Sequence, residues 1–263
     1  MQFDFSQRWR DRRTSYRVRG EVIDTRSYEV APLLSDAAAK SFVVTHHYSG
    51  TYPAARFRFG LFRAGVLQGV AVFSHPCNDA VLTSVFPGSA VESVELGRLV
   101  LLDEVPFNGE TWFIARAFHL LRREGLRGVV TFADPLPRRA ADGTVTTPGH
   151  VGQIYQAHNG LYLGRSTPRT LHLLPDGSTF SARAAQKIRR KERGWRYAVE
   201  QLVAAGAPVP ADDDLAPWLS SSLCRLASVR HPGNHRYAWA FSRAETRRLV
   251  AAARAFPRVL SPG

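Results

Sequence analysis

Short runs in which apolar and polar residues alternate occupy the middle of the chain, and this is the pattern of half-buried β-strands. Two of them, Arg56–Phe62 and Val66–Ser74, flank Arg63-Ala64-Gly65 and predict a β-hairpin. Further strands are predicted at Val94–Leu102 and Gly128–Ala133. The segment from residue 94 to residue 133 therefore has the order strand, turn, helix, strand.

The helix in that order is predicted over Gly109–Glu124, because its apolar residues recur at three- and four-residue spacing. These residues are Phe113, Ile114, Ala117, Phe118 and Leu121. One face of the helix is expected to pack on the sheet while Arg116, Arg122 and Arg123 face water. Together with a helix beginning at Asp36, the pattern predicts an α/β (α+β) fold with a mixed central sheet flanked by helices.

The turn before this helix is suited to phosphate binding, because the first turn of a helix presents unpaired N–H groups and a partial positive charge. We predict that a cofactor carrying phosphate groups, an acyl-coenzyme A, binds there. The residues expected to bind it are Asn108, Gly109, Glu110 and Thr111. Two parallel strands that separate beside this turn would admit the thin arm of an acyl-coenzyme A. Tyr155, on a short helix further on, is placed to protonate the departing thiolate.

The later part of the chain has less apolar patterning. The proline-containing segment Pro135–Pro148 is predicted to be a surface loop and a candidate lid. Strands at Leu161–Arg165 and Thr170–Leu174 are expected to close the sheet as a pair. A strand at Arg236–Phe241 and a last helix at Ala244–Ala255 follow.

A basic segment lies between residues 183 and 196, where seven cations face a single acid, Glu192. The cations are Arg183, Lys187, Arg189, Arg190, Lys191, Arg193 and Arg196. Such a run is ordinarily a solvated helix face, but this excess favours contact with DNA phosphates. The predicted organisation is a flexible basic arm over residues 1–15, a core over 16–180 and a basic C-terminal extension over 181–263 packed on the core.

Composition supports a polyanionic partner. The 263 residues carry 35 Lys and Arg against 22 Asp and Glu, which gives a formal charge of +13.

Cys77 and Cys224 fit neither a disulfide framework nor a zinc site, and both are expected to be buried thiols. The chain shows no secretory signal and no run long enough to span a membrane, so a cytoplasmic protein is expected.

Several motifs together resemble the GNAT acyltransferase superfamily and, within it, the Mom family of phage DNA adenine modification proteins, of which bacteriophage Mu has a member. They are residues 46–50 (HHYSG), 95–99 (ELGRL), 106–111 (PFNGET), 131–134 (TFAD), 149–159 (GHVGQIYQAHN) and 232–237 (PGNHRY). The resemblance extends from about Ala39 to Phe241. Two features depart from it: the insertion at 135–148 is long, and the turn lacks the glycine-rich pattern of ordinary GNAT enzymes.

The resemblance implies transfer of an acyl-derived group, a methylcarbamoyl, to N6 of adenine in double-stranded DNA, which protects the DNA from restriction. Acetyl-CoA or another acyl-CoA is the expected donor. Asp134 is the first candidate for the general base or the N6 anchor, and His47 is the second. Tyr48 is a candidate wall for a flipped base, and Asn159 could read the adenine edge.

The remaining candidates contact cofactor or DNA. Arg98 could hold the acyl carbonyl or a phosphate, while His235 and Arg236 are predicted to bind DNA with the basic segment. Asp134 could instead cap a turn and Tyr155 could be a core residue. An iron or zinc site using His47 and Asp134 is not supported by spacing, so no metal ligands are assigned.

Two other functions fit the same residues. The chain could be an N-acetyltransferase that acts on a protein or small-molecule amine, or a DNA-binding protein without catalytic activity. A heavier adenosine in cellular DNA would favour DNA modification. Acetyl-CoA turnover on amines with unmodified DNA would favour the first alternative, and DNA binding without turnover would favour the second.

Overall fold

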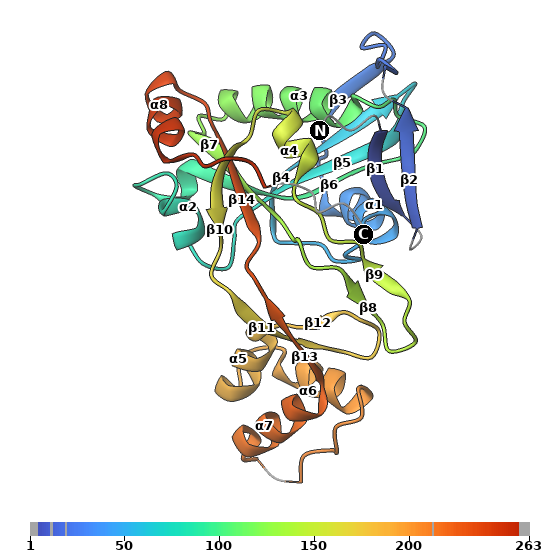
Figure 1. Cartoon of the computed structure of the whole chain (residues 1–263), viewed down its shortest axis with the longest axis vertical. Coiled ribbons are helices and arrows are strands. Elements are labelled where there is room, and N and C mark those ends of the chain that lie inside the picture. The colour runs from blue at the N-terminus through green and yellow to red at the C-terminus, as the bar shows by residue number, and fades with distance from the viewer. Residues whose placement is uncertain (1–4, 11–12, 19, 212, 258–263) are drawn as a thin grey trace. The chain divides into compact units, whose positions relative to one another are not determined.

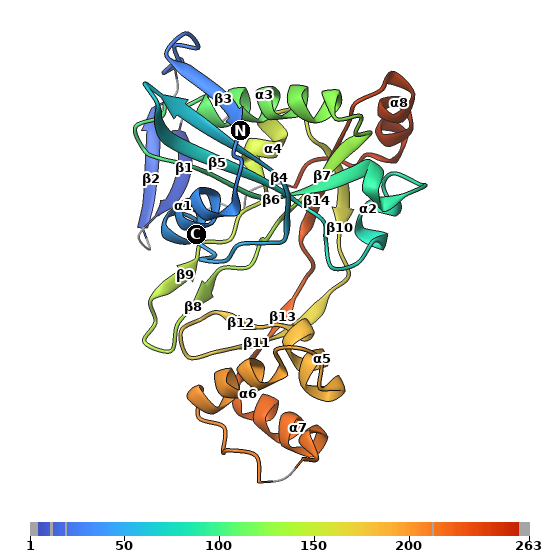
Figure 2. The ribbon, with the colours of Figure 1, turned by 180° about the vertical axis from the view of Figure 1, so that it is seen from behind.

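A computed structural model describes residues 5–10, 13–18, 20–211 and 213–257, and its elements are labelled in Figures 1 and 2. The chain forms two compact units. The first, here called the sheet unit, comprises residues up to 135, residues 150–166 and residues from 234 onward. The second, the insert unit, comprises residues 136–149 and 167–233, so it is supplied by two insertions into the sheet unit.

A seven-stranded sheet forms the centre of the sheet unit, in the order β10-β14-β7-β6-β5-β4-β3. In chain order these are β3 (Tyr28–Pro32), β4 (Ala55–Arg63), β5 (Val66–Ser74), β6 (Ser93–Leu101), β7 (Gly128–Ala133), β10 (Leu161–Arg165) and β14 (His235–Ala240). All neighbours are antiparallel except β6 and β7, which are parallel because α3 carries the chain back between them. The predicted mixed sheet is confirmed.

Helices cover both faces of this sheet. On one face lie α3 (Gly109–Arg123) and α4 (Gln153–Ala157), and on the other lie α1 (Asp36–His46), α2 (Ala80–Thr83) and α8 (Arg243–Ala252). Strand β5 shows why the sheet needs two layers: Ala71 and Phe73 pack on the α3 side, whereas Val70 and Val72 pack against α1. A strand buried on both faces loses its polar alternation, as β5 does.

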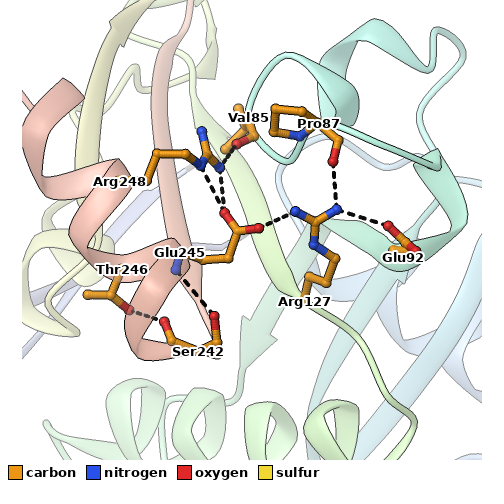
Figure 3. A network of polar contacts seen from close by, with 8 residues as sticks. All are labelled: Val85, Pro87, Glu92, Arg127, Ser242, Glu245, Thr246 and Arg248. Carbon is orange, nitrogen blue, oxygen red and sulfur yellow. Dashed lines mark hydrogen bonds and ion pairs between the residues drawn. The ribbon is translucent and has the colours of Figure 1, made fainter.

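A polar network joins three elements at the end of the sheet where β7 begins (Figure 3). The Arg127 guanidinium donates to the Pro87 carbonyl at 2.6 Å and to Glu92 Oε2 at 2.9 Å, and it also bonds Glu245 of α8. Arg248 bonds Glu245 in turn and reaches the Val85 carbonyl. These contacts lower the pKa of the Glu245 carboxyl, first through Arg127. They fix the start of α8 against the strand.

A flexible arm is predicted over residues 1–15, and the structure describes residues 5–10 and 13–15 of it, which lie in strands. Within the described residues, β1 (Phe5–Arg10) pairs antiparallel with β2 (Arg13–Val18). Arg8 is buried, with 7% of the residue exposed. Burial of a cation so near the start of the chain is not visible in local composition, because its partners lie about a hundred residues away.

The insert unit has its own core. Strands β11 (Arg169–Leu173), β12 (Thr179–Phe180) and β13 (Ala227–His231) form one small sheet, and β8 (Arg138–Arg139) pairs with β9 (Val145–Thr147). Three helices follow: α5 (Ala182–Arg190), α6 (Trp195–Ala204) and α7 (Leu215–Arg225). Their apolar faces share a cluster that includes Ile188, Leu202 and Leu219.

Three details of the insert unit and its borders differ from prediction. The segment Pro135–Pro148 contains the β8–β9 hairpin and is not a structureless loop. The strands at 161–165 and 169–173 do not pair: β10 joins β14, whereas β11 joins β12 and β13. The basic segment is two helices, because Lys191 (φ 49°) and Gly194 (φ 82°) both adopt left-handed backbone between α5 and α6.

Both cysteines are exposed rather than buried, and neither forms a disulfide. Among the helices of the described residues, none has the length and apolar character needed to cross a bilayer.

Candidate active site at the fork of two parallel strands

The only parallel strand pair described in the sheet unit separates partway along its length. Strand β7 pairs with β6 from Ser93 opposite Gly128 to Leu96 opposite Thr131, and no further, although β6 continues to Leu101. At the point of separation the Thr131 hydroxyl donates to the Leu96 carbonyl at 2.9 Å. The Thr131 side chain thus makes the last hydrogen bond between the two strands, at the point where their backbone pairing ends. We call this point the fork.

A β-bulge lies directly beyond the fork. On the other edge of β6, Val72 is opposite Arg98 and Phe73 is opposite Leu96, so Gly97 is an extra residue without a partner in β5. A Cβ at position 97 would lie 2.7 Å from Ser74 Oγ, so no larger residue fits without displacing its neighbours. The bulge re-aims the side chains that follow and makes Arg98 a residue of the fork.

The Arg98 guanidinium is held by the segment that follows α1. Its Nε donates to the Thr51 carbonyl at 2.9 Å and Nη2 donates to Thr51 Oγ1 at 2.6 Å, while Nη1 bonds the Gly97 carbonyl at 2.5 Å. Burial lowers the pKa of this guanidinium, and nearby Tyr48 and Glu95 oppose the shift. An arginine has five N–H donors, so this one retains donors for a ligand.

Glu95 is a functional candidate that the sequence reasoning missed. Burial raises the pKa of its carboxyl, and the Arg98 charge opposes that rise. A carboxylate with a raised pKa is a stronger base than an ordinary one. The signal was present in the sequence, because Glu95 is an acid inside the otherwise apolar strand run that precedes Gly97.

His47 and Tyr48 lie at the C-terminal end of α1. Nδ1 of His47 accepts a hydrogen bond from the Ser49 backbone N–H at 3.2 Å, which places the proton of the neutral ring on Nε2. Burial, together with Arg98 and His150, lowers the pKa of His47 to about 3. The ring stacks on Tyr48 with centroids 4.3 Å apart. At neutral pH His47 is therefore an uncharged hydrogen-bond donor.

His150 and Asp134 meet where β7 ends. The His150 backbone N–H donates to the Asp134 carbonyl at 2.7 Å, and the His150 ring nitrogen Nε2 lies 3.5 Å from the Tyr48 hydroxyl. Burial lowers the pKa of His150, while the Asp134 charge raises it. His150 stands in one of the family motifs, but no role was predicted for it. A neutral imidazole beside a carboxylate is a suitable proton acceptor.

Tyr155 lies on α4 and reaches the fork from the α3 side of the sheet. Burial raises its pKa, and a hydrogen bond with Thr131 opposes that shift. Its ring centroid is 6.4 Å from that of His150 and 5.6 Å from that of Tyr237. Gly152, with φ 81°, starts α4, and a Cβ there would lie 2.8 Å from the Tyr155 ring. The glycine allows α4 to approach the sheet.

The fork thus brings together five of the predicted residues, and adds Glu95 and His150 to them. The five are His47, Tyr48, Arg98, Asp134 and Tyr155. Among the other candidates, His235 lies near this group: its pKa is lowered to about 4 by burial, Arg165 and His150, and its Nδ1 is 2.9 Å from the Tyr162 hydroxyl.

Other predicted residues lie outside the fork. Asn159 is exposed in a left-handed conformation (φ 57°) after α4, and Arg236 is directed toward Ser84 and the Leu163 carbonyl. The predicted cofactor residues 108–111 form the start of α3, where the Glu110 carboxylate is buried against Arg8. The predicted DNA-binding cations at 183–193 belong to the insert unit.

No group of three or more His, Cys, Asp or Glu side chains is arranged to hold a metal ion in the part of the chain that the structure describes. A cavity of about 650 Å³ lies beside the network of Figure 3. Its lining comes from the end of α3, the start of β7 and the start of α8, and includes Arg122, Arg127 and Phe241. None of the residues of the fork lines this cavity.

Comparison with known proteins identifies the class. Residues 27–209 match the model of the Mom protein family, which is well over half of the chain. The chain therefore belongs to the Mom family, as its motifs predicted. A search of curated proteins finds no match.

Among solved structures, one similar chain is a PaiA N-acetyltransferase from Thermoplasma acidophilum in complex with coenzyme A. The two sequences are 16% identical, the match covers 42% of this chain and 54% of that chain, and the TM-score is 0.28. A Bacillus subtilis acetyltransferase in complex with CoA has 8% identity, 82% and 98% coverage and a TM-score of 0.34. An agmatine N-acetyltransferase has 9% identity, 81% and 100% coverage and a TM-score of 0.39. The chain spans about half the length of the first of these.

Proposed function

We propose that this protein is a GNAT-like acyltransferase that modifies the N6 amine of adenine in double-stranded DNA, using an acyl-CoA as donor. Membership of the Mom family supports a DNA-modifying or acyl-transfer enzyme. The observation that carries the proposal is the fork, where β6 and β7 separate after Leu96 and Thr131 beside Arg98 and Tyr155.

The fork fits the donor chemically. Beyond Leu96 the edge of β6 that faces β7 has no strand beside it, so a thin arm carrying amide groups can pair with that edge as an additional strand. The helix α3 begins a few residues after β6 ends, and its first turn favours the negative charge of a diphosphate. Glycine is required at position 97, beside the point where the strands part, because Ser74 and Pro53 occupy the space that a side chain there would take.

The reaction needs two proton movements. The N6 amine attacks the thioester carbonyl carbon, a C–N bond forms, the C–S bond breaks, and the amine loses a proton while the thiolate gains one. We assign proton acceptance to neutral His150, with Asp134 stabilising the charged imidazolium. Tyr155, whose raised pKa keeps it protonated at neutral pH, donates to the thiolate.

Arg98 is suited to the charge that develops on the carbonyl oxygen. Three of its donors are fixed by Thr51 and the Gly97 carbonyl, so the remaining N–H groups are held in a defined direction. Preorganised donors of this kind are worth about 10²–10³-fold in rate. Glu95 lies near enough to affect the pKa of Arg98, and we assign it to keeping that cation charged and oriented.

The acceptor side contains aromatic and uncharged groups. Tyr48 and His47 stack on each other and border His150, which suits a flipped purine held by stacking and by hydrogen bonds from a neutral imidazole. The methylcarbamoyl product and protection from restriction are the finer part of the proposal. They rest on the resemblance to the family. The methylcarbamoyl product requires a thioester donor whose carbonyl carbon already bears a methylamino group, because acetyl-CoA in the same step would give N6-acetyladenine.

The proposal is tested by nucleoside mass spectrometry of plasmid DNA from cells that express the protein. We expect a heavier adenosine, and we expect Asp134→Ala to abolish it. Asp142→Ala is a matched control, because Asp142 is an exposed acid of the insert unit. Unmodified DNA with wild-type protein, together with acetyl-CoA turnover on other amines, would replace DNA by a protein or small-molecule acceptor.

A further inference from the structure

The first strand of the chain supplies a buried arginine to the loop between β6 and α3. Arg8 Nε donates to Glu110 Oε1 at 2.6 Å, and both side chains are 6% exposed. The Arg8 Nη1 group donates to the carbonyls of Leu102 and Val105, both at 2.8 Å, and Nη2 donates to the Pro106 carbonyl at 3.3 Å. One guanidinium therefore holds three backbone carbonyls of the loop and the first turn of α3.

A second contact ties the same region to the N-terminal segment. The Ile23 backbone N–H donates to Asn108 Oδ1 at 2.8 Å, and Ile23 is 3% exposed within the main core cluster. Asn108 precedes α3, and Gly109 is so tightly packed that a Cβ there would lie 2.3 Å from Val105 Cγ1. The loop is thus fixed by residues 8 and 23. Both lie before the region that matches the family model, which begins at residue 27.

The direction of the Arg8 bonds determines the direction of the loop amides. A trans peptide plane holds its C=O and the following N–H on opposite sides, and the described residues contain no cis peptide bond. The Pro106 carbonyl faces Arg8, so the Phe107 N–H points away from it. Of the three carbonyls that Arg8 holds, that of Val105 precedes Pro106, which has no N–H, so the N–H groups directed away from Arg8 are those of Asp103 and Phe107. N–H groups that precede a helix favour an anion.

Arg8 cannot itself bind a ligand in this position, because its guanidinium is buried and bonded to protein oxygens. Its removal would leave the Glu110 carboxylate buried without its cation, and Glu110 Oε2 already has no hydrogen-bond partner. Breaking one half of a buried ion pair is much more disruptive than replacing both halves. The pair is therefore a strong constraint on the loop conformation.

We propose that Arg8 is a positioning residue that holds the β6–α3 loop in the conformation that binds the diphosphate of the acyl-CoA donor. This rests on the proposed function, since it assigns the diphosphate to that loop. The N-terminal hairpin is then a structural part of the donor site. It makes the protein prefer donors that carry a nucleotide diphosphate to donors that end at pantetheine.

The test compares two probes in binding experiments on the full chain: coenzyme A and pantetheine, which lacks the diphosphate. Arg8→Gln is expected to weaken coenzyme A binding by about tenfold or more, the size of one charge-assisted hydrogen bond. Pantetheine binding is expected to change little. Arg26→Gln is the matched control, since Arg26 pairs with Asp24 at the surface and is 90% exposed.

Two further variants keep the test decisive if Arg8→Gln does not fold. Arg8→Lys keeps the charge beside Glu110 but cannot span the loop carbonyls, so an intermediate affinity for coenzyme A is expected. The double change Arg8→Gln with Glu110→Gln removes both buried charges and should fold while still binding coenzyme A weakly.

The outcomes separate the two proposals. If the wild-type protein binds neither probe, the proposed function fails, and the role of Arg8 fails with it. If the wild-type protein binds coenzyme A and the Arg8 variants bind it equally well, only the role of Arg8 is overturned. Equal weakening for coenzyme A and pantetheine would also overturn it, because Arg8 would then act on the fold in general and not on the diphosphate loop.

Discussion

The fork and the α5–α6 region use charge in opposite ways. At the fork, Glu95, His47 and His150 are partly buried, and burial is the first cause of the pKa shift of each. Between residues 183 and 196 six of the seven cations are exposed, and only Lys187 is partly buried. Ion pairs there, such as Arg183 with Glu192 at 2.6 Å, lie at the surface.

The difference fits the two tasks that the proposed function requires. Chemistry at one atom of a base needs groups whose protonation is fixed and whose solvent is largely removed. Holding a polyanion needs mobile cations that displace counterions, and burial would only weaken them. We therefore expect changes at the fork to reduce turnover and changes in the insert unit to reduce DNA affinity.

After the complete loss expected for Asp134→Ala, the next largest effect is expected for Tyr155→Phe. Loss of the proton donor should lower the rate of DNA modification by about 10²–10⁴-fold. The salt dependence of DNA binding should stay the same, because no charge changes. The measurement is single-turnover modification followed by nucleoside mass spectrometry. Tyr197→Phe removes a hydroxyl from a 66% exposed residue of α6 and should leave the rate unchanged. A comparable drop in both variants would refute the assignment.

The next effect concerns pH and His235, which is 1% exposed and has its pKa lowered from 6.5 to about 4. A group whose folded pKa is depressed in this way favours folding when it is neutral. Its contribution is complete above pH 6.5 and is lost as pH falls toward 4. The ceiling is about 3 kcal/mol. Urea unfolding at pH 7 and pH 4.5 should show a smaller difference in the free energy of unfolding for His235→Gln.

The control for the pH experiment is His119→Gln, because His119 is exposed on α3. It should keep the wild-type difference between the two pH values. If His235→Gln also kept that difference, the buried imidazole would not be a source of acid sensitivity in the sheet unit.

A smaller effect is expected for charge reversal in the insert unit. Arg190→Glu with Lys191→Glu should reduce the slope of log affinity against log salt by about 0.9 for each phosphate that the protein no longer neutralises. DNA-binding titrations at several salt concentrations measure it, and the rate at saturating DNA should not change. Arg26→Glu is the control from the sheet unit. An unchanged slope in the double variant would place DNA binding elsewhere and remove the division of tasks between the fork and the insert unit.

Sequence reasoning was most successful where apolar patterning is continuous. It located β4, β5, β6, β7 and α3, and it predicted that β6 and β7 separate beside a helix N-terminus. It could not find contacts between distant residues. The Arg8–Glu110 pair joins positions 102 residues apart, and β10 pairs with β14 although residues 167–233 lie between them in the sequence. Neither contact can be predicted from the pattern of apolar and polar residues near it in the sequence.

Sequence reasoning also missed features that depend on one or two residues. The break between α5 and α6 begins at Lys191, a residue type that seldom adopts left-handed backbone, so the run of cations alone predicts a single helix. His150 lies in a segment without periodicity, and its role depends on where the chain after β7 returns to the sheet. The sequence shows that a histidine is present at position 150, but it does not show which side chains surround that histidine in the fold.

The smallest effect is expected for a substitution at Lys191, in the break between α5 and α6, which changes both the cost of the backbone conformation and the charge at that position. Lys191 has φ 49° at the end of α5, a conformation that glycine adopts without steric cost. Lys191→Gly should therefore raise the free energy of unfolding by about 1 kcal/mol or less, because left-handed backbone costs a residue with a Cβ about 1–2 kcal/mol and the greater chain entropy of unfolded glycine offsets part of that gain. Its ion pair with Asp213, at 3.5 Å, is exposed and adds little. The same variant removes one cation, so DNA affinity should fall while stability rises. Thermal unfolding and salt titration of this single variant measure both, and a joint decrease would mean that Lys191 supports the insert unit and not the contact with DNA.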